Sequence, residues 1–154
     1  MILELARHSD LEAINVLTKQ ANDLHAAWRP DLFRNTDTGF SESVFIQLQK
    51  DKEIYVVRSA EAVAAFVRIR IQPIGRPDDV PVRKVLFLEE ICVDEQLRHQ
   101  GIGMRIMDDL KVMAKAEGCT SICLSVFPQN ENALAFYRKC GFDVTNIAMR
   151  CGIE

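Results

Sequence analysis

Apolar residues in the first fifty positions recur at helical spacing in two stretches. In the first stretch, apolar side chains three and four residues apart mark one face of a helix: Leu11, Ile14, Leu17, Ala21 and Leu24. Ser9 followed by Glu12 has the form of a capping box, and Arg29-Pro30 should end the helix, because a residue before proline avoids helical angles. We expect a loop over residues 31–40 and a second helix over residues 41–50, with Val44, Phe45 and Leu48 facing inward.

From residue 54 the hydrophobic period changes to two, which is typical of strands. Residues 54–58 predict a strand and residues 59–62 a turn. The next strand has strictly alternating apolar positions: Val63, Ala65, Val67, Ile69 and Ile71. Glycine, prolines and aspartates within residues 75–81 predict a loop. Residues 84–93 should return as the antiparallel partner, which closes a hairpin.

Helices and strands alternate in the second half of the chain. A helix ended by Gly118 carries an apolar face of Ile102, Ile106, Leu110 and Met113. A strand over 121–127, a short helix through Lys139 and a last strand over 142–149 follow. With a short apolar run at residues 2–6, this order predicts a single α/β domain over residues 1–154. Its mixed, mostly antiparallel sheet should be flanked by helices on both faces.

Composition narrows the class of protein. The 154 residues are 48% apolar and 27% charged, which suits one folded domain, and a net charge of −3 argues against a dedicated nucleic-acid binder. No apolar run approaches the roughly 20 residues of a membrane-spanning helix, and no basic-then-apolar leader opens the chain, so we expect a cytoplasmic protein. The five cysteines lack metal-ligand or disulfide spacing, which predicts core thiols and no metal.

Residues 97–104, Leu-Arg-His-Gln-Gly-Ile-Gly-Met, connect a predicted buried strand to an amphipathic helix. Glycines allow close backbone approach, and the free N–H groups of a first helical turn favour an anion. The alternative is a tight turn without a ligand. The segment lacks the third glycine of a dinucleotide-binding loop and the Gly-Lys-Ser/Thr end of a P-loop.

Two blocks of sequence together carry a family resemblance. Arg98-x-x-Gly101-x-Gly103 resembles the Gln/Arg-x-x-Gly-x-Gly/Ala acyl-CoA signature of the GNAT family of N-acetyltransferases. Residues 130–142, from Asn130 through Tyr137 to Phe142, are similar to that family's Asn-x-x-Ala-x-x-Leu/Phe-Tyr-x-x-x-Gly-Phe block. The blocks and their strands cover about residues 84–143. Leu124-Ser125-Val126 stands where members that acetylate protein N-termini often carry Leu-Glu-Val, which speaks against that activity.

The resemblance implies a GNAT fold that binds acetyl-CoA as cosubstrate where two parallel strands splay apart. The pyrophosphate would lie on backbone amides of the glycine loop: Arg98, His99, Gln100, Gly101, Ile102, Gly103 and Met104. The pantetheine arm would pair with the backbone of Ile91, Cys92 and Val93, where an N–H group could polarise the thioester carbonyl. Asn130 would meet the pantetheine amides, and Tyr137 would protonate the leaving thiolate. Simple packing of Tyr137 against the strand is the alternative.

An amine acceptor requires a base, because an ordinary amine with a pKa of about 10 is charged at neutral pH. Glu89 and Glu90 are adjacent in a predicted strand, so period two puts them on opposite faces unless a bulge intervenes. Glu89 would then share a face with Ile91 and Val93. The string Leu-Glu-Glu-Ile-x-Val is similar to one in polyamine-type members, which favours Glu89 as base, with Glu90 second. A structural ion pair with Arg68 or Arg70 is the alternative.

The sequence predicts less about the pocket that would bind the amine acceptor. His25, Trp28, Asp31 and Phe33 surround Pro30, and a pocket of aromatic rings with one carboxylate would suit an amine. Anchoring of this loop to the core is the alternative.

The favoured interpretation is therefore an acetyl-CoA-dependent N-acetyltransferase that acts on a small amine, an amino acid, a polyamine-like molecule or a peptide. A non-catalytic acyl-CoA sensor is the second reading, which would not need Tyr137 or a strand carboxylate. A doubly wound nucleotide-binding domain is disfavoured by the predicted hairpin over residues 54–93. The resemblance also implies homodimerisation through the last strand.

Overall fold

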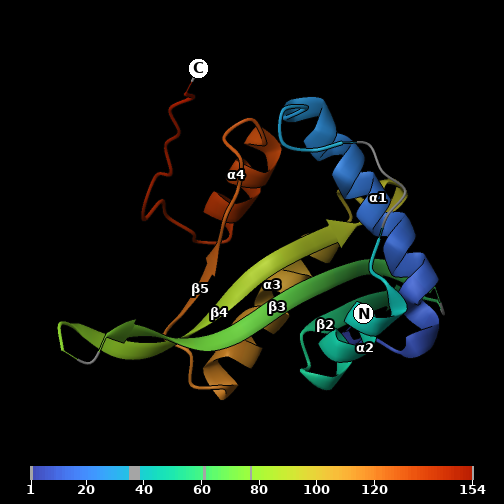
Figure 1. The fold of residues 1–154 in the computed structure, drawn as a ribbon. Helices are drawn as coiled ribbons and strands as arrows, with labels where there is room; N and C mark the ends of the chain where they lie inside the picture. Colours follow the sequence, from blue (N-terminus) through green and yellow to red (C-terminus); the bar gives the residue numbers. More distant parts are fainter. Residues whose placement is uncertain (1, 35–38, 61, 77, 154) are drawn as a thin grey trace.

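A computed structural model describes residues 2–34, 39–60, 62–76 and 78–153, and it contains a five-stranded mixed sheet (Figure 1). The strands lie in chain order: β1 (Leu3–Leu5), β2 (Ile54–Ser59), β3 (Ala62–Arg76), β4 (Val80–Val93) and β5 (Ser121–Leu124). Neighbours are antiparallel except β4 and β5, which run parallel. A mixed, mostly antiparallel sheet is thereby confirmed.

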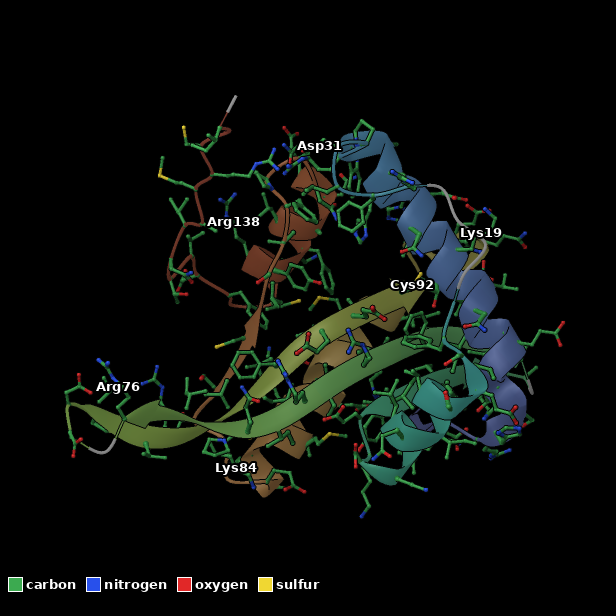
Figure 2. All side chains as sticks on the ribbon, in the orientation of Figure 1. Lys19, Asp31, Arg76, Lys84, Cys92 and Arg138 are labelled. Atoms are coloured by element: carbon green, nitrogen blue, oxygen red, sulfur yellow. The ribbon has the colours of Figure 1, made fainter. Side chains whose placement is uncertain are left out.

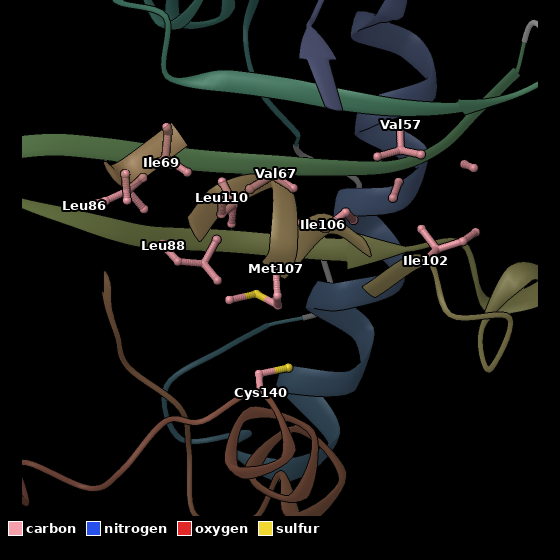
Figure 3. Close-up of a cluster of buried hydrophobic side chains, with 13 residues drawn as sticks. Val57, Val67, Ile69, Leu86, Leu88, Ile102, Ile106, Met107, Leu110 and Cys140 are labelled. Atoms are coloured by element: carbon pink, nitrogen blue, oxygen red, sulfur yellow. The ribbon is translucent and has the colours of Figure 1, made fainter. Parts of the chain in front are cut away.

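Helices cover both faces of the sheet. On one face, α1 (Leu11–Trp28) and α2 (Glu42–Lys50) bury apolar side chains against alternate strand residues. This core contains Ile14 and Leu17 of α1, Phe45 of α2, Val56 of β2 and Phe66 of β3. On the other face lie α3 (Ile102–Ala116) and α4 (Glu131–Lys139), where α3 buries Ile106, Met107 and Leu110 against Val67, Ile69 and Leu86 (Figure 3). Two short 3₁₀ helices, η1 (His8–Asp10) and η2 (Glu95–Leu97), precede α1 and the glycine loop.

Several element boundaries differ from the sequence prediction, and the strand predicted over residues 121–127 ends at Leu124, where its pairing with β4 ends. Ser9 does not cap α1; Asp10 precedes the helix, and its carboxylate accepts a hydrogen bond from the backbone N–H of Arg7 at 2.7 Å. β3 and β4 extend into the predicted loop over 75–81, because Gly75 adopts a φ of +127° at a register shift and keeps the strands paired. In the predicted loop over 31–40 and the turns at 59–62 and 75–81, positions 35–38, 61 and 77 lie outside the described residues.

The predicted last strand over residues 142–149 is wrong. The segment has no strand partner in the described structure, and its apolar side chains beyond Phe142 are exposed, with Met149 93% accessible. A strand forms only where its backbone pairs with a neighbouring strand. The strand that precedes this segment in the chain, β5, is only four residues long and offers little backbone for pairing. Within this segment Phe142 alone packs against the α3–α4 core. Homodimerisation through this segment stays a prediction.

Among the described residues, no helix combines the length and the apolar character needed to span a bilayer.

Replacing Asp10 by Asn is expected to lower the free energy of unfolding by about 3 kcal/mol or more at pH 7. Asp10 is only 4% exposed and receives hydrogen bonds from Arg58 at 2.6 and 2.9 Å, so its loss leaves the largely buried guanidinium with Glu4 as its one remaining ion-pair partner among the described residues. Urea denaturation measures the change. Asp79→Asn is the matched control, because its pair with Arg76 is solvent-exposed and should contribute less than about 1 kcal/mol.

The Asp10 contribution should also depend on pH. Burial raises the pKa of this carboxyl, but hydrogen bonds from Arg58 and the Arg7 N–H, with the charges of both arginines, outweigh burial and lower it. A lowered folded-state pKa means that the stabilisation is present above the unfolded value of about 3.9 and is lost as pH falls below it. The difference between wild type and Asp10→Asn should therefore shrink below pH 4, and a constant difference would contradict this account.

Candidate active site

The two parallel strands part at one point, where a β-bulge interrupts β4. β4 pairs with β5 from Val85 to Leu88 and no further among the described residues. On the other side of β4, Ile69 of β3 pairs with Leu88 and Arg68 pairs with Glu90, so Glu89 is the extra, bulged residue. Figure 1 shows β4 and β5 diverging beyond this point. The edge of β4 from residue 89 to 93 is therefore open to an extended ligand.

The glycine loop presents a run of unpaired backbone N–H groups beside this fork. Gly101 takes a left-handed φ of +82°, which a residue with a side chain adopts only at a cost, and His99 also has a positive φ, +62°. The first backbone bond of α3 runs from the Arg105 N–H to the Gly101 carbonyl, 3.1 Å. Within the described structure, the N–H groups of residues 98–104 have no acceptor. With the positive end of the α3 dipole, they form a cradle that suits a pyrophosphate.

The side chains of the loop have different roles. Arg98 Nε donates a hydrogen bond to the Val93 carbonyl oxygen at 3.1 Å and so ties the loop to the end of β4. His99 and Gln100 are exposed, whereas Ile102 is buried in the α3 core. Met104 packs beside Cys140, with a sulfur–sulfur distance of 3.5 Å. Binding of a ligand by these residues stays a prediction.

Gly103 allows α3 and α4 to approach closely. A Cβ at this position would lie 3.2 and 3.3 Å from the Phe136 ring, tighter than ordinary contact. We expect Gly103→Ala to displace Phe136 and the adjacent Tyr137, to weaken acetyl-CoA binding about tenfold and to cost about 1 kcal/mol of stability. Isothermal titration and thermal unfolding measure both effects.

Two further variants test the cause of this effect. Gly152→Ala, where an added Cβ meets only open space, should leave both measurements unchanged. Gly103→Ala combined with Phe136→Leu should regain affinity if the ring contact is responsible. Unchanged affinity in Gly103→Ala itself would show that the cradle does not depend on this contact.

Cys92 does not point toward the open edge of β4. Its thiol is buried under α1 and donates a hydrogen bond to the Leu17 carbonyl oxygen at 3.2 Å (Figure 2). Burial raises the pKa of this thiol to about 11, so it is neutral at physiological pH. Ile91 and Val93 face the opposite core, under α3. Only the backbone of residues 91–93 is therefore available to a ligand at the fork.

The bulge brings both candidate carboxylates to the same face. Glu89 lies 2.8 Å from Arg70, measured from Oε1 to Nη2, and 4.0 Å from Arg68. Glu90 Oε1 lies 3.4 Å from the same Arg68 Nη2. The expectation that Glu89 shares a face with Ile91 and Val93 is wrong, because the extra residue resets the alternation. The ion pairs with Arg68 and Arg70, the alternative reading, are both formed.

Glu90 differs from Glu89 in its surroundings. Burial raises the pKa of Glu90; the charge of Arg68 and its hydrogen bond oppose this, and the charge of Glu89 adds to it. Glu90 Oε2 is buried without a hydrogen bond among the described residues, and so is Arg68 Nε. Such unsatisfied atoms are costly and uncommon in folded proteins.

Helix α4 positions the other two predicted residues. Asn130 caps α4, since its Oδ1 accepts a hydrogen bond from the Ala133 N–H at 3.1 Å, and its side-chain NH₂ group remains for other partners. The ring of Tyr137 lies between those of Phe136 and Phe142, with centroid distances of 5.3 and 5.7 Å. Burial raises the pKa of Tyr137 to about 12, and its hydroxyl makes no hydrogen bond within the described residues.

The predicted acceptor residues form a cluster at the end of α1. The His25 ring lies 6.0 Å from that of Trp28 and 5.2 Å from that of Phe33. Phe127, which follows β5 and which the sequence did not suggest, completes the cluster at 6.0 Å from His25. Burial lowers the pKa of His25, which favours its neutral form.

Asp31 does not offer a free negative charge to an amine. Arg29 lies 2.8 Å and Arg150 3.0 Å from its carboxylate, and these hydrogen bonds lower the Asp31 pKa. Arg150 lies in the C-terminal segment, 119 residues away in sequence. Figure 2 labels Asp31 just after the end of α1.

Comparison with known proteins identifies similar sequences and folds. A sequence profile described as the acetyltransferase (GNAT) family matches residues 21–142. A probable glucosamine 6-phosphate N-acetyltransferase 2 of Oryza sativa is 35% identical over 66 residues, 43% of this chain and 38% of that protein. A thialysine N-epsilon-acetyltransferase of Bos taurus is 34% identical over 56 residues, 36% of this chain and 33% of that protein. The chain thus matches less than half the length of these curated relatives.

Solved structures match over the whole chain. A mutant of the BH1408 protein of Bacillus halodurans superposes with a TM-score of 0.90 at 26% identity and covers 100% of both chains. An aminoglycoside N-acetyltransferase in complex with CoA has a TM-score of 0.71 at 15% identity, over 99% of this chain and 98% of that one. At 15% identity, this second likeness concerns the fold alone.

Proposed function

This chain belongs to the GNAT family of acetyltransferases, and from that premise we propose that it is an N-acetyltransferase. It would transfer the acetyl group of acetyl-CoA directly to a primary amine, with residues 1–154 acting as one domain in the cytoplasm. The observation that carries the proposal is the fork after Leu88, beside the unpaired N–H groups of residues 98–104. A structural neighbour in complex with CoA supports it.

The chain's backbone would hold most of acetyl-CoA. The N–H groups of residues 98–104 suit its pyrophosphate, because they are unpaired and lie at a helix N-terminus. The open edge of β4 at residues 91–93 suits the amides of the pantetheine arm, which would pair with it as an added strand does. The free NH₂ group of Asn130 would approach the same arm. Acetyl-CoA supplies the activated acyl group, and no metal is required.

Transfer forms a C–N bond and breaks a C–S bond, while the substrate nitrogen loses two protons and the sulfur gains one. A carboxylate takes one proton from the substrate ammonium, directly or through a water, which frees the nitrogen lone pair for attack on the thioester carbon. We assign this step to Glu90, with Glu89 second, because Glu90 has an oxygen without a partner while Arg70 holds Glu89 at 2.8 Å. A backbone N–H near Cys92 or Val93 would polarise the thioester carbonyl. Tyr137 would give its hydroxyl proton to the departing sulfur, and its phenolate would take up, directly or through a water, the second proton that the nitrogen loses after attack.

The named relatives support an amine acceptor without identifying it. Glucosamine 6-phosphate and thialysine are the acceptors in their names, which is consistent with a small-molecule amine here. A peptide amine stays within the proposal. A non-catalytic acyl-CoA sensor is the competing function, and Tyr137 and the paired carboxylates favour the enzyme over it.

Two measurements test the proposal. Isothermal titration with acetyl-CoA measures binding, and release of free CoA thiol measures turnover over a panel of amines. Binding with thiol release that depends on an amine is expected. Absence of acetyl-CoA binding would overturn the proposal, and binding without turnover on any amine would favour the sensor.

A further inference from the structure

The charges around the proposed amine site indicate what else its substrate carries. Resting on the proposed function, we propose that the acceptor is an amino acid-like zwitterion, whose anionic group Arg70 and Arg68 bind while its amine reacts. Arg70 would then be a specificity-determining residue.

Each of the three candidate carboxylates on the acceptor side already has at least one arginine partner. Glu89 lies 2.8 Å from Arg70, Glu90 lies 3.4 Å from Arg68, and Asp31 lies between Arg29 and Arg150. A polyamine carries several positive charges, and at each carboxylate it would also approach the guanidinium group that is paired there. Repulsion between these like charges opposes the binding of a polyamine. A molecule with one ammonium and one anionic group has no net charge, so its binding leaves the net charge of the site unchanged. The cluster therefore suits a net-neutral acceptor.

Arg70 is available to an incoming anion. Its side chain is 50% exposed, and its guanidinium lies over the Phe87 ring at 5.8 Å from the centroid. Glu89 is its one ion-pair partner among the described residues, so N–H groups of the planar fork remain for a ligand. Guanidinium groups fixed in this way bind carboxylates and phosphates through two parallel hydrogen bonds.

Arg68 and Glu90 carry complementary unmet hydrogen-bonding groups. They face each other as register partners of β3 and β4, yet Arg68 Nε has no acceptor and Glu90 Oε2 has no donor in the described structure. Their contact of 3.4 Å is long beside the 2.7–2.9 Å of a strong charge-assisted bond. A ligand that enters between them would satisfy both atoms by offering its ammonium to Glu90 and an anionic oxygen to Arg68, whereas an anionic oxygen that reaches Arg70 instead would leave only Glu90 satisfied.

The spacing of the arginines suggests how far apart the two substrate groups lie. Arg68 and Arg70 are two residues apart on β3, which is about 7 Å along a strand. Glu90, opposite Arg68, would face the amine. An anion on Arg70 would then stand several bonds from the reacting nitrogen, as in an ω-amino acid.

Matched acceptors separate the contribution of the anion from that of the amine. Thiol release is measured with 6-aminohexanoate against hexylamine and with 4-aminobutyrate against butylamine. We expect kcat/KM about 10- to 100-fold higher for the acid of each pair, which is the range for a charge-assisted contact. Arg70→Gln should bring this ratio toward one, and Arg70→Lys should give an intermediate ratio. Arg83→Gln removes an exposed arginine elsewhere on β4 and should leave the ratio as in wild type.

The outcomes distinguish the inference from the proposed function. Equal or faster turnover of the alkylamines would overturn the inference and leave the acetyltransferase proposal standing. A preference for the acids that persists in Arg70→Gln would remove Arg70 from the site. Binding of acetyl-CoA without turnover of either member of any pair would overturn the inference and count against the enzyme itself.

Discussion

Replacing Glu90 by Gln is expected to lower kcat by about 100- to 1,000-fold, the range of a lost general base. Glutamine keeps the shape of the side chain but does not accept a proton from the ammonium. Because burial raises the Glu90 pKa, wild-type kcat/KM should fall with decreasing pH through a midpoint above the ordinary glutamate value of about 4.3. The direction follows from chemistry, since only the ionised carboxylate is a base. Steady-state rates from pH 5 to 9 measure this fall of kcat/KM at low pH, the acidic limb of the profile. The acidic limb should be absent in Glu90→Gln.

Glu89→Gln is the matched control for this experiment. It removes the same charge one residue away, at the bulge, from a carboxylate that Arg70 already holds at 2.8 Å. We expect a smaller loss of rate, with the acidic limb retained. If Glu89→Gln instead abolishes the limb while Glu90→Gln keeps it, Glu89 is the base, as the likeness to polyamine-type members suggests. Unchanged pH profiles in both variants would exclude a strand carboxylate.

The sequence predicts the fold well because its signals are local and strong. The apolar face of α3 and the alternation over residues 63–71 depend only on spacing along the chain, and both elements form. The last strand fails for a non-local reason, since residues 142–149 have strand-like composition but no paired backbone. The length of β5 likewise depends on where β4 departs from it, at Leu88.

The candidate site is predictable in its residues and less so in its geometry. The glycine loop and α4 carry motifs, so Gly101, Asn130 and Tyr137 could be named in advance. The bulge at Glu89 has no marker in the sequence, because any residue can be the extra one, and it reverses the expected face of Glu89. The pairing of Asp31 with Arg150 joins residues 119 apart, and Phe127 enters the aromatic cluster from another element. Such contacts require the folded chain.

Replacing Tyr137 by Phe is expected to lower kcat by about 100-fold, with little change in the affinity for acetyl-CoA. Phenylalanine keeps the ring that packs against Phe136 and Phe142 and removes only the hydroxyl, which has no other partner among the described residues. Because burial raises the Tyr137 pKa to about 12, the phenol keeps its proton across the working range. Its ionisation should therefore cause no fall in rate on the alkaline side below about pH 10.

The second tyrosine of the chain supplies the control. Tyr55 lies in β2, away from the fork, and burial raises its pKa as well. Tyr55→Phe should therefore keep the wild-type rate, which separates loss of a hydroxyl at the site from loss of any buried phenol. Thermal unfolding of both variants checks that packing is preserved, and titration with acetyl-CoA checks binding. A Tyr137→Phe enzyme with wild-type kcat would show that the thiolate departs without this proton, and the ring of Tyr137 would then serve packing alone.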